Sequence, residues 1–110
     1  MSKYHSKKTV VDGIEFMSKK EAERYCELKL LEKAGKIKDL RLQYQFELQP
    51  YFKKNGKTYR AITYIADFTY FDNKRMKNVV EDVKGYRTKE YRLKKKLFEY
   101  KFPYLTIVEI

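Results

Sequence analysis

The chain has few of the residues from which the most recognisable protein sites are built. Its 110 residues include one cysteine, Cys26, and one histidine, His5. A single cysteine excludes an internal disulfide, and no Cys/His metal cluster can form. His5 sits in a basic amino-terminal arm, where it is a poor candidate for a ligand or base. A Gly-rich phosphate loop and a Ser-His-Asp set are also missing, so the candidates for chemistry are carboxylates and lysines.

Long apolar runs are missing too. No stretch approaches 18 apolar residues, and residues 1–8 are polar and basic without the apolar core of a signal peptide. We therefore expect no contact with a membrane. Cys26 lies within a helical pattern, which predicts a small core residue. Together these features predict a cytoplasmic protein.

Acidic residues are outnumbered. Lys and Arg total 26 against 15 Asp and Glu, which gives a formal net charge of +11, and aromatic residues make up 16% of the chain. The cations are spread along the whole sequence and alternate with tyrosine and phenylalanine. Cations can hold a phosphate backbone while rings stack on bases. This composition favours a nucleic-acid partner over a basic surface that merely keeps the protein in solution.

The pattern predicts a flexible basic arm over residues 1–8 and one domain over 9–110. Asp12-Gly13 and Asn55-Gly56 are hairpin turn signals, Ser18 and Thr88 are helix caps, and Gly35 ends the first helix. The expected elements are a hairpin over 9–16, a helix over 18–34, strands over 40–52, 58–71 and 77–84, a helix over 88–102, and a strand over 104–110. A helical crossover before the last strand implies parallel pairing, so we expect an α/β fold with a mixed sheet.

Two acids lie in segments that otherwise read as buried strand. Asp67 follows Tyr64-Ile65-Ala66, and Asp82 opens the triplet Asp82-Val83-Lys84. A buried carboxylate is costly unless something such as a cation compensates it. If the hairpin between these strands is centred near Lys74 and Arg75, Asp67 lies opposite Asp82, on the same face as Lys84. Two carboxylates and a lysine can hold Mg²⁺ and activate water, so the first hypothesis is a metal-dependent nuclease.

Each member of this group has an expected role. Asp67 and Asp82 would bind one or two Mg²⁺ ions, with the Val83 carbonyl as an extra ligand. Lys84 would orient or help deprotonate the attacking water, or neutralise charge on the phosphate. The alternative is a surface salt bridge, because such triplets are common in a chain that is 37% charged. The apolar flanks and the partner acid favour the metal site.

Two further residues keep alternative interpretations. Glu21 lies at the edge of the buried face of the first helix, where it could lean toward the metal or complete a capping box with Ser18. Lys94 falls within the apolar arc of the second helix, where it could reach a phosphate or cover the core with its stem. The cations around it form a general backbone-contact patch, consisting of Arg87, Lys89, Arg92, Lys95 and Lys96.

With these residues in place, the chain resembles the PD-(D/E)XK nuclease superfamily, whose restriction-endonuclease-like core has the order αβββαβ. The matching pieces are Ser18-x-x-Glu21, Asp67, Asp82-Val83-Lys84 and Tyr91-x-x-Lys94. It looks closest to a family of small phage and prophage proteins catalogued as a domain of unknown function, which share phrases like Tyr-Ile-Ala-Asp-Phe and Glu-Asp-Val-Lys-Gly. Asp stands here where Glu is commoner before x-Lys, and Ala66 replaces the eponymous proline.

The resemblance implies a central mixed sheet flanked by helices and an Mg²⁺- or Mn²⁺-dependent DNA endonuclease. It points to branched DNA, such as junctions or flaps, in phage replication or recombination inside a bacterial cell. It also favours a metal-site role for Glu21 and an active-site role for Lys94. Two rivals remain, namely a non-catalytic nucleic-acid-binding accessory protein and a small module with an acidic protein partner. A homodimer is plausible, because cutting two strands usually requires two sites.

Overall fold

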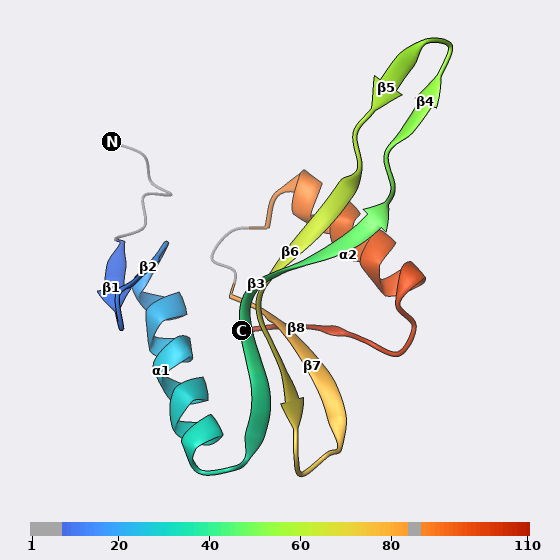
Figure 1. The fold of residues 1–110 in the computed structure, drawn as a ribbon. Helices are drawn as coiled ribbons and strands as arrows, with labels where there is room; N and C mark the ends of the chain where they lie inside the picture. Colours follow the sequence, from blue (N-terminus) through green and yellow to red (C-terminus); the bar gives the residue numbers. More distant parts are fainter. Residues whose placement is uncertain (1–7, 84–86) are drawn as a thin grey trace.

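The structure, a computed structural model, describes residues 8–83 and 87–110. It is an α/β fold in which two helices accompany a mixed four-stranded sheet, with the strand order β3-β6-β7-β8 (Figure 1). The sheet strands are β3 (Ile37–Gln49), β6 (Ile62–Asp72), β7 (Lys77–Asp82) and β8 (Ile107–Glu109). The first three are antiparallel neighbours, and β8 pairs with β7 in parallel. The predicted element order and mixed sheet are therefore confirmed.

The local turn and cap signals act as the sequence predicts. A hairpin of β1 (Thr9–Val11) and β2 (Ile14–Phe16) turns through Asp12 and Gly13, which both have positive φ. Helix α1 (Lys19–Lys33) begins after Ser18, whose Oγ accepts a hydrogen bond from the Glu21 N–H at 3.1 Å. The helix ends before Gly35, whose φ of +75° is a conformation that favours glycine.

Helix α2 (Lys89–Lys101) is capped by Thr88, whose hydroxyl group accepts from the Tyr91 N–H at 3.0 Å. It ends two residues before Pro103, as expected. Neither this helix nor any other among the described residues is long and apolar enough to cross a membrane. The predicted arm over 1–8 lies outside the described residues except for Lys8.

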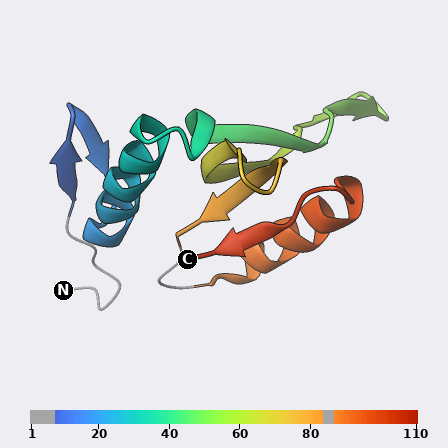
Figure 2. The same cartoon turned by 90° about the horizontal axis from the view of Figure 1, so that it is seen from below.

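Each helix covers its own hydrophobic core, and the two helices lie on different sides of the sheet (Figure 2). Under α1, Leu28 packs with Phe68, and both are fully buried. Under α2, the fully buried Phe98 packs against Tyr64 and Val80. On β7, Val79 packs against the α1 core and its neighbour Val80 belongs to the α2 core. This is the alternation expected of a strand between two covered faces.

The helices expose one residue that was predicted to lie in the core and several other apolar side chains. Cys26 is exposed, and Leu30 keeps 68% of its surface in contact with solvent. On α2, Leu93 and Tyr100 are exposed as well. Both helices turn a narrower face to the sheet than the apolar pattern suggested, because that pattern cannot show which part of a broad apolar arc the sheet will cover.

The long strands over 40–52 and 58–71 are each interrupted, which the sequence did not indicate. Between β3 and β6 the chain forms a separate hairpin of β4 (Phe52–Lys54) and β5 (Lys57–Tyr59), turning at Asn55-Gly56. The pairing of β3 with β6 also shifts register between Glu47 and Gln49. The β4–β5 hairpin projects from the body of the protein, beyond the sheet (Figure 1).

Candidate functional site

The β6–β7 hairpin brings the two acids of the strands together. Its register pairs Asp72 with Lys77 and continues to Phe68 with Glu81, one step before Asp67 and Asp82. The hairpin centre is thus where the sequence placed it. The backbone N–H of Val83 donates to Oδ2 of Asp67 at 2.8 Å, which fixes the Asp67 carboxylate beside the main chain that follows Asp82.

Asp82 and Glu81 point to opposite faces of the sheet, as alternation predicts. Asp82 is 1% exposed and accepts a hydrogen bond from the Tyr64 hydroxyl on the α2 side. Burial raises the pKa of that hydroxyl, and the hydrogen bond to Asp82 and the charges of Asp82 and Asp67 act in the same direction. The charges of Asp82 and Asp67 therefore both raise the pKa of Tyr64. At the end of the strand, the Ile110 N–H donates to the Asp82 carbonyl at 2.9 Å and continues the pairing with β8.

Glu21 reaches the same place from α1 through a residue that sequence reasoning missed. The side-chain amide of Gln43 donates to Glu21 Oε2 at 3.2 Å and to Asp67 Oδ1 at 3.3 Å. One nitrogen thus joins the helix acid to the strand acid. Ser18 satisfies the backbone N–H of Glu21, so the helix cap and the carboxylate contact use different atoms of this residue. The carboxylate, which belongs to a side chain only 6% exposed, leans toward the sheet.

Gln43 occupies an irregular point of β3. Its φ of +54° is rare for a residue other than glycine, and it lies opposite Asp67, between the pairs Leu42–Phe68 and Tyr44–Ala66. Strained backbone of this kind often accompanies functional sites. A glutamine within a polar strand gives no signal of such a role in the sequence. Together with Phe16 and Met17, Gln43 and Glu21 line a pocket of about 260 Å³ beside the first hairpin.

An ion pair between Arg24 and Glu81 joins helix α1 to strand β7. Glu81, which is 1% exposed, accepts from Arg24 of α1 at 2.8 Å through Nε and at 2.6 Å through Nη2. Glu81 also accepts a hydrogen bond from the Tyr70 hydroxyl. Because Arg24 lies one helical turn after Glu21, and Glu81 directly precedes Asp82, this pair fixes the position of Glu21 relative to Asp82.

The structure describes one of the two lysines expected at the site. Lys84 lies outside the described residues, directly after Val83. Lys94 is partly exposed and forms an ion pair with Glu90 one turn earlier on α2, with Nζ and Oε1 3.1 Å apart. The ion-pair partner that the structure describes for Lys94 thus belongs to the same helix, α2.

The cations predicted to contact phosphates lie on α2 and just before it, and two of them contact strand β8. Glu109 of β8 pairs with Arg87 at 3.0 Å and with Lys95 at 3.3 Å, and it accepts from the Tyr91 hydroxyl at 2.7 Å. Chiefly through the Arg87 hydrogen bond, these partners lower the pKa of Glu109 to about 2. The remaining predicted cations, Lys89, Arg92 and Lys96, are exposed.

This basic region adjoins the acids through two aromatic rings. Tyr91 and Tyr64 have ring centroids 6.5 Å apart. Burial raises the pKa of Tyr91, and the hydrogen bond to Glu109 and the charge of Asp82 act in the same direction. Arg87 and Lys95, which pair with Glu109 beside Tyr91, are thus connected to the buried Asp82 through the rings of Tyr91 and Tyr64.

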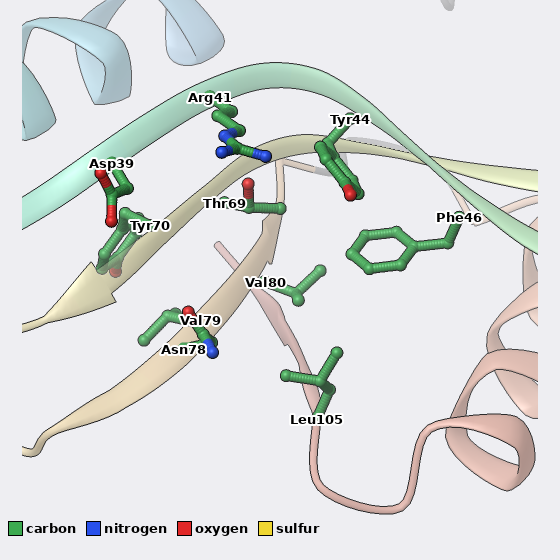
Figure 3. A pocket seen from close by; sticks show the side chains of 10 residues that line it. All are labelled: Asp39, Arg41, Tyr44, Phe46, Thr69, Tyr70, Asn78, Val79, Val80 and Leu105. Atoms are coloured by element: carbon green, nitrogen blue, oxygen red, sulfur yellow. The ribbon is translucent and has the colours of Figure 1, made fainter.

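A second pocket, of about 290 Å³, opens on the sheet itself (Figure 3). Its lining includes Asp39 and Arg41 from β3 and Val80 from β7, with Leu105 from the segment before β8. The carboxylates of the candidate site do not line it. This pocket is therefore separate from the candidate site.

The donors at the candidate site are oxygen atoms of carboxylates, which are the ligands that Mg²⁺ prefers. Across residues 8–83 and 87–110, no group of three or more His, Cys, Asp or Glu side chains lies close enough together to hold a metal ion. Instead, protein N–H groups join the acids, with Gln43 between Glu21 and Asp67, and Val83 donating to Asp67.

The fold and site together define a small basic α/β domain in which a glutamine joins a helix carboxylate to a carboxylate of the mixed sheet. The chain belongs to the family described as "Protein of unknown function (DUF1064)", whose model matches residues 1–110. This confirms the expected domain-of-unknown-function family. Comparison with curated proteins gave no match, and comparison with solved structures gave none either.

Proposed function

We propose that this protein is a metal-dependent endonuclease that hydrolyses phosphodiester bonds of DNA, with a restriction-endonuclease-like core. The observation that carries the proposal is the convergence of Glu21 and Asp67 on Gln43, with Asp82 one pairing step beyond the β6–β7 ladder. A helix acid and a strand acid thus meet at one amide in a chain of net charge +11. The αβββαβ order and the Asp82-Val83-Lys84 triplet of the resembled superfamily agree with it.

The acids suit a divalent cation on chemical grounds. Gln43 places one amide nitrogen, a donor of partial positive charge, within hydrogen-bond distance of two carboxylates. A small hard cation would be attracted to the same oxygens. Asp67, Asp82 and Glu21 would hold Mg²⁺ or Mn²⁺, and the Val83 carbonyl is a further candidate ligand. When bound, the cation would supply positive charge for water activation and for the phosphate transition state.

The protein's own residues have complementary tasks in this proposal. The Arg24–Glu81 pair and Tyr64 orient the acids. Lys84, two positions after Asp82, is proposed to orient the attacking water or to neutralise charge that develops on the phosphate. Lys94 and the cations of α2 would hold the DNA backbone next to the acids.

One observation favours a second function, that of a non-catalytic nucleic-acid-binding accessory protein. Gln43 and Val83 already satisfy oxygens of Glu21 and Asp67 with protein donors, and such bonds hold acids together without a metal. The accessory protein would keep its DNA affinity in EDTA and yield no metal-dependent product.

A cleavage assay separates the two functions. Wild type, Lys84→Ala and the matched control Lys77→Ala, which removes an exposed lysine from the start of β7, would be incubated with labelled linear, flapped and four-way-junction DNA. Each reaction would contain Mg²⁺, Mn²⁺ or EDTA. The nuclease predicts metal-dependent product from wild type and Lys77→Ala and none from Lys84→Ala. Binding without product on every substrate would support the accessory protein.

Asp82→Asn provides a second test at the acids themselves. The amide keeps the size of the side chain and can still accept from Tyr64, so the fold should survive. We expect cleavage to be lost while DNA binding remains largely intact. Full cleavage by this variant would remove Asp82 from the proposed mechanism.

A further inference from the structure

The β4–β5 hairpin is an exposed, basic and aromatic arm with no evident task in the fold. Every residue from Gln49 to Ala61 is exposed, and neither hydrophobic core includes any of them. The hairpin stands away from both helices and from the four-stranded sheet (Figure 1). Its side chains therefore contribute little to the stability of the domain, and they are available for a partner.

The hairpin carries a flat aromatic platform. Phe52 and Tyr59 face each other across the two strands, with ring centroids 4.7 Å apart and planes only 8° from parallel. Each keeps 40% of its surface exposed, and the neighbouring Tyr51 keeps 65%. Exposed apolar rings are a cost in water unless something covers them. A stacked pair offers its outer faces to a further planar group.

The charge around this platform has one sign. Residues 51–60 include Lys53, Lys54, Lys57 and Arg60 and no acid. Lys57 lies over the Tyr59 ring, with Nζ 5.3 Å from its centroid. Within the described ranges, no carboxylate forms an ion pair with any of these four cations. This charge repels a second copy of a chain of net charge +11 and attracts a polyanion.

We propose that the β4–β5 hairpin binds unpaired nucleotides of a DNA strand, with bases stacked on Phe52 and Tyr59 and phosphates held by the lysines. Single-strand-binding proteins combine these two features, because a ring can stack on any unpaired base and cations follow the backbone. Bases in a duplex are already stacked, so the rings give a preference for unpaired DNA that the lysines alone would not give. This inference rests on the nucleic-acid part of the proposed function and specifies its substrate as DNA with a single-stranded segment.

The hairpin is also connected directly to the candidate site. Tyr59 precedes Asp67 by eight residues, and most of that length is strand β6. At roughly 3.3 Å per residue, the Cα atoms of Tyr59 and Asp67 are separated by about 26 Å of extended chain. A flap or junction could therefore place its unpaired segment on the hairpin while its duplex lies near the acids.

The test measures binding without cleavage. Fluorescence anisotropy in EDTA would compare labelled single-stranded DNA with the duplex of the same sequence, for the full chain. We expect Phe52→Ala/Tyr59→Ala to weaken single-strand binding about tenfold or more and duplex binding less than about threefold. The matched control is Tyr100→Ala/Tyr104→Ala, which removes two rings that are 90% and 97% exposed elsewhere; it should change neither affinity.

A second set of variants separates ring stacking from hairpin folding. Tyr59→Phe keeps the ring and should keep single-strand affinity, whereas Tyr59→Leu keeps an apolar side chain without a ring and should lose it. Replacing Lys53, Lys54 and Lys57 with alanine should weaken binding to both DNA forms. It should also reduce the salt dependence of single-strand binding by up to about two log units per log unit of salt.

Three outcomes would overturn the inference. They are an equal loss for single strand and duplex in the ring variant, an equal effect of the control variant, and a change of oligomeric state with no change in DNA binding. The last would assign the hairpin to protein contacts. If wild type binds neither DNA form, the nucleic-acid basis of the proposed function fails as well. If wild type cleaves DNA but the hairpin variants bind normally, only this inference fails.

Discussion

Replacing Arg24 with methionine should destabilise the protein strongly, because the structure shows its guanidinium group paired with the fully buried carboxylate of Glu81. Glu81 is 1% exposed and accepts two hydrogen bonds from the guanidinium group. Breaking such a buried pair from one side typically costs about 3–5 kcal/mol, since the remaining charge is left without compensation. A domain of this size has only about 5–15 kcal/mol of stability in total. The Arg24→Met variant should therefore be close to unfolding.

The magnitude can be measured by thermal unfolding. At about 4 °C per kcal/mol for a small domain, the Tm should fall by about 12 °C or more. The control Glu27→Gln breaks the exposed contact that Arg24 also makes, at 3.0 Å, and should shift stability by less than about 1 kcal/mol. In the double variant Arg24→Met/Glu81→Gln, the amide oxygen can still accept from Tyr70, so most of the loss should be recovered.

A small effect would refute this reasoning. If the Tm of Arg24→Met falls by less than about 4 °C, less than about 1 kcal/mol is lost and the Glu81 charge is not effectively buried. If the double variant is no more stable than Arg24→Met, the loss comes from packing of the arginine stem and not from the uncompensated charge. The pair also joins α1 to β7, so a folded Arg24→Met protein should show weaker cleavage with DNA binding retained.

Three further predictions follow from the site and the core. If Asp67 helps bind Mg²⁺, the ion at ten times its Kd should stabilise wild type by about 1.4 kcal/mol, and Asp67→Asn should abolish this rise in Tm while EDTA has no effect on the variant. The folded-state pKa of Glu109, about 2, lies below its ordinary 4.5. Its stabilising effect is therefore complete above about pH 4.5 and is lost as the pH falls toward 2. Glu109→Gln should flatten the pH dependence of unfolding within that window, and an unchanged slope would contradict the Arg87 contact. Phe98→Ala, at a fully buried site between three aromatic rings, should cost about 3–5 kcal/mol in urea unfolding, and a loss below about 1 kcal/mol would show that the α2 core does not depend on it.

Local chemistry in the sequence determined the order and type of the elements. Gly13, Gly35 and Gly56 lie at turns or helix ends with positive φ, where glycine has no steric cost. Ser18 and Thr88 satisfy helix N–H groups that have no backbone partner. These effects act over a few residues, so they can be read along the chain. The position of the hairpin centre likewise predicted the β6–β7 register, and the period of two along a strand predicted the opposite faces of Glu81 and Asp82.

Contacts between distant segments were decided only by the tertiary structure. The exposure of Cys26 and Leu30 depends on how much of α1 the sheet covers, which an apolar pattern does not specify. Gln43 joins Glu21 to Asp67 across 22 and 24 positions of sequence, through a strand irregularity that no local preference predicts. The sequence by itself determined which acids this protein can bring together. The packing of α1 against the sheet decided which atoms connect them, because hydrogen-bond partners so far apart along the chain depend on the relative placement of whole elements.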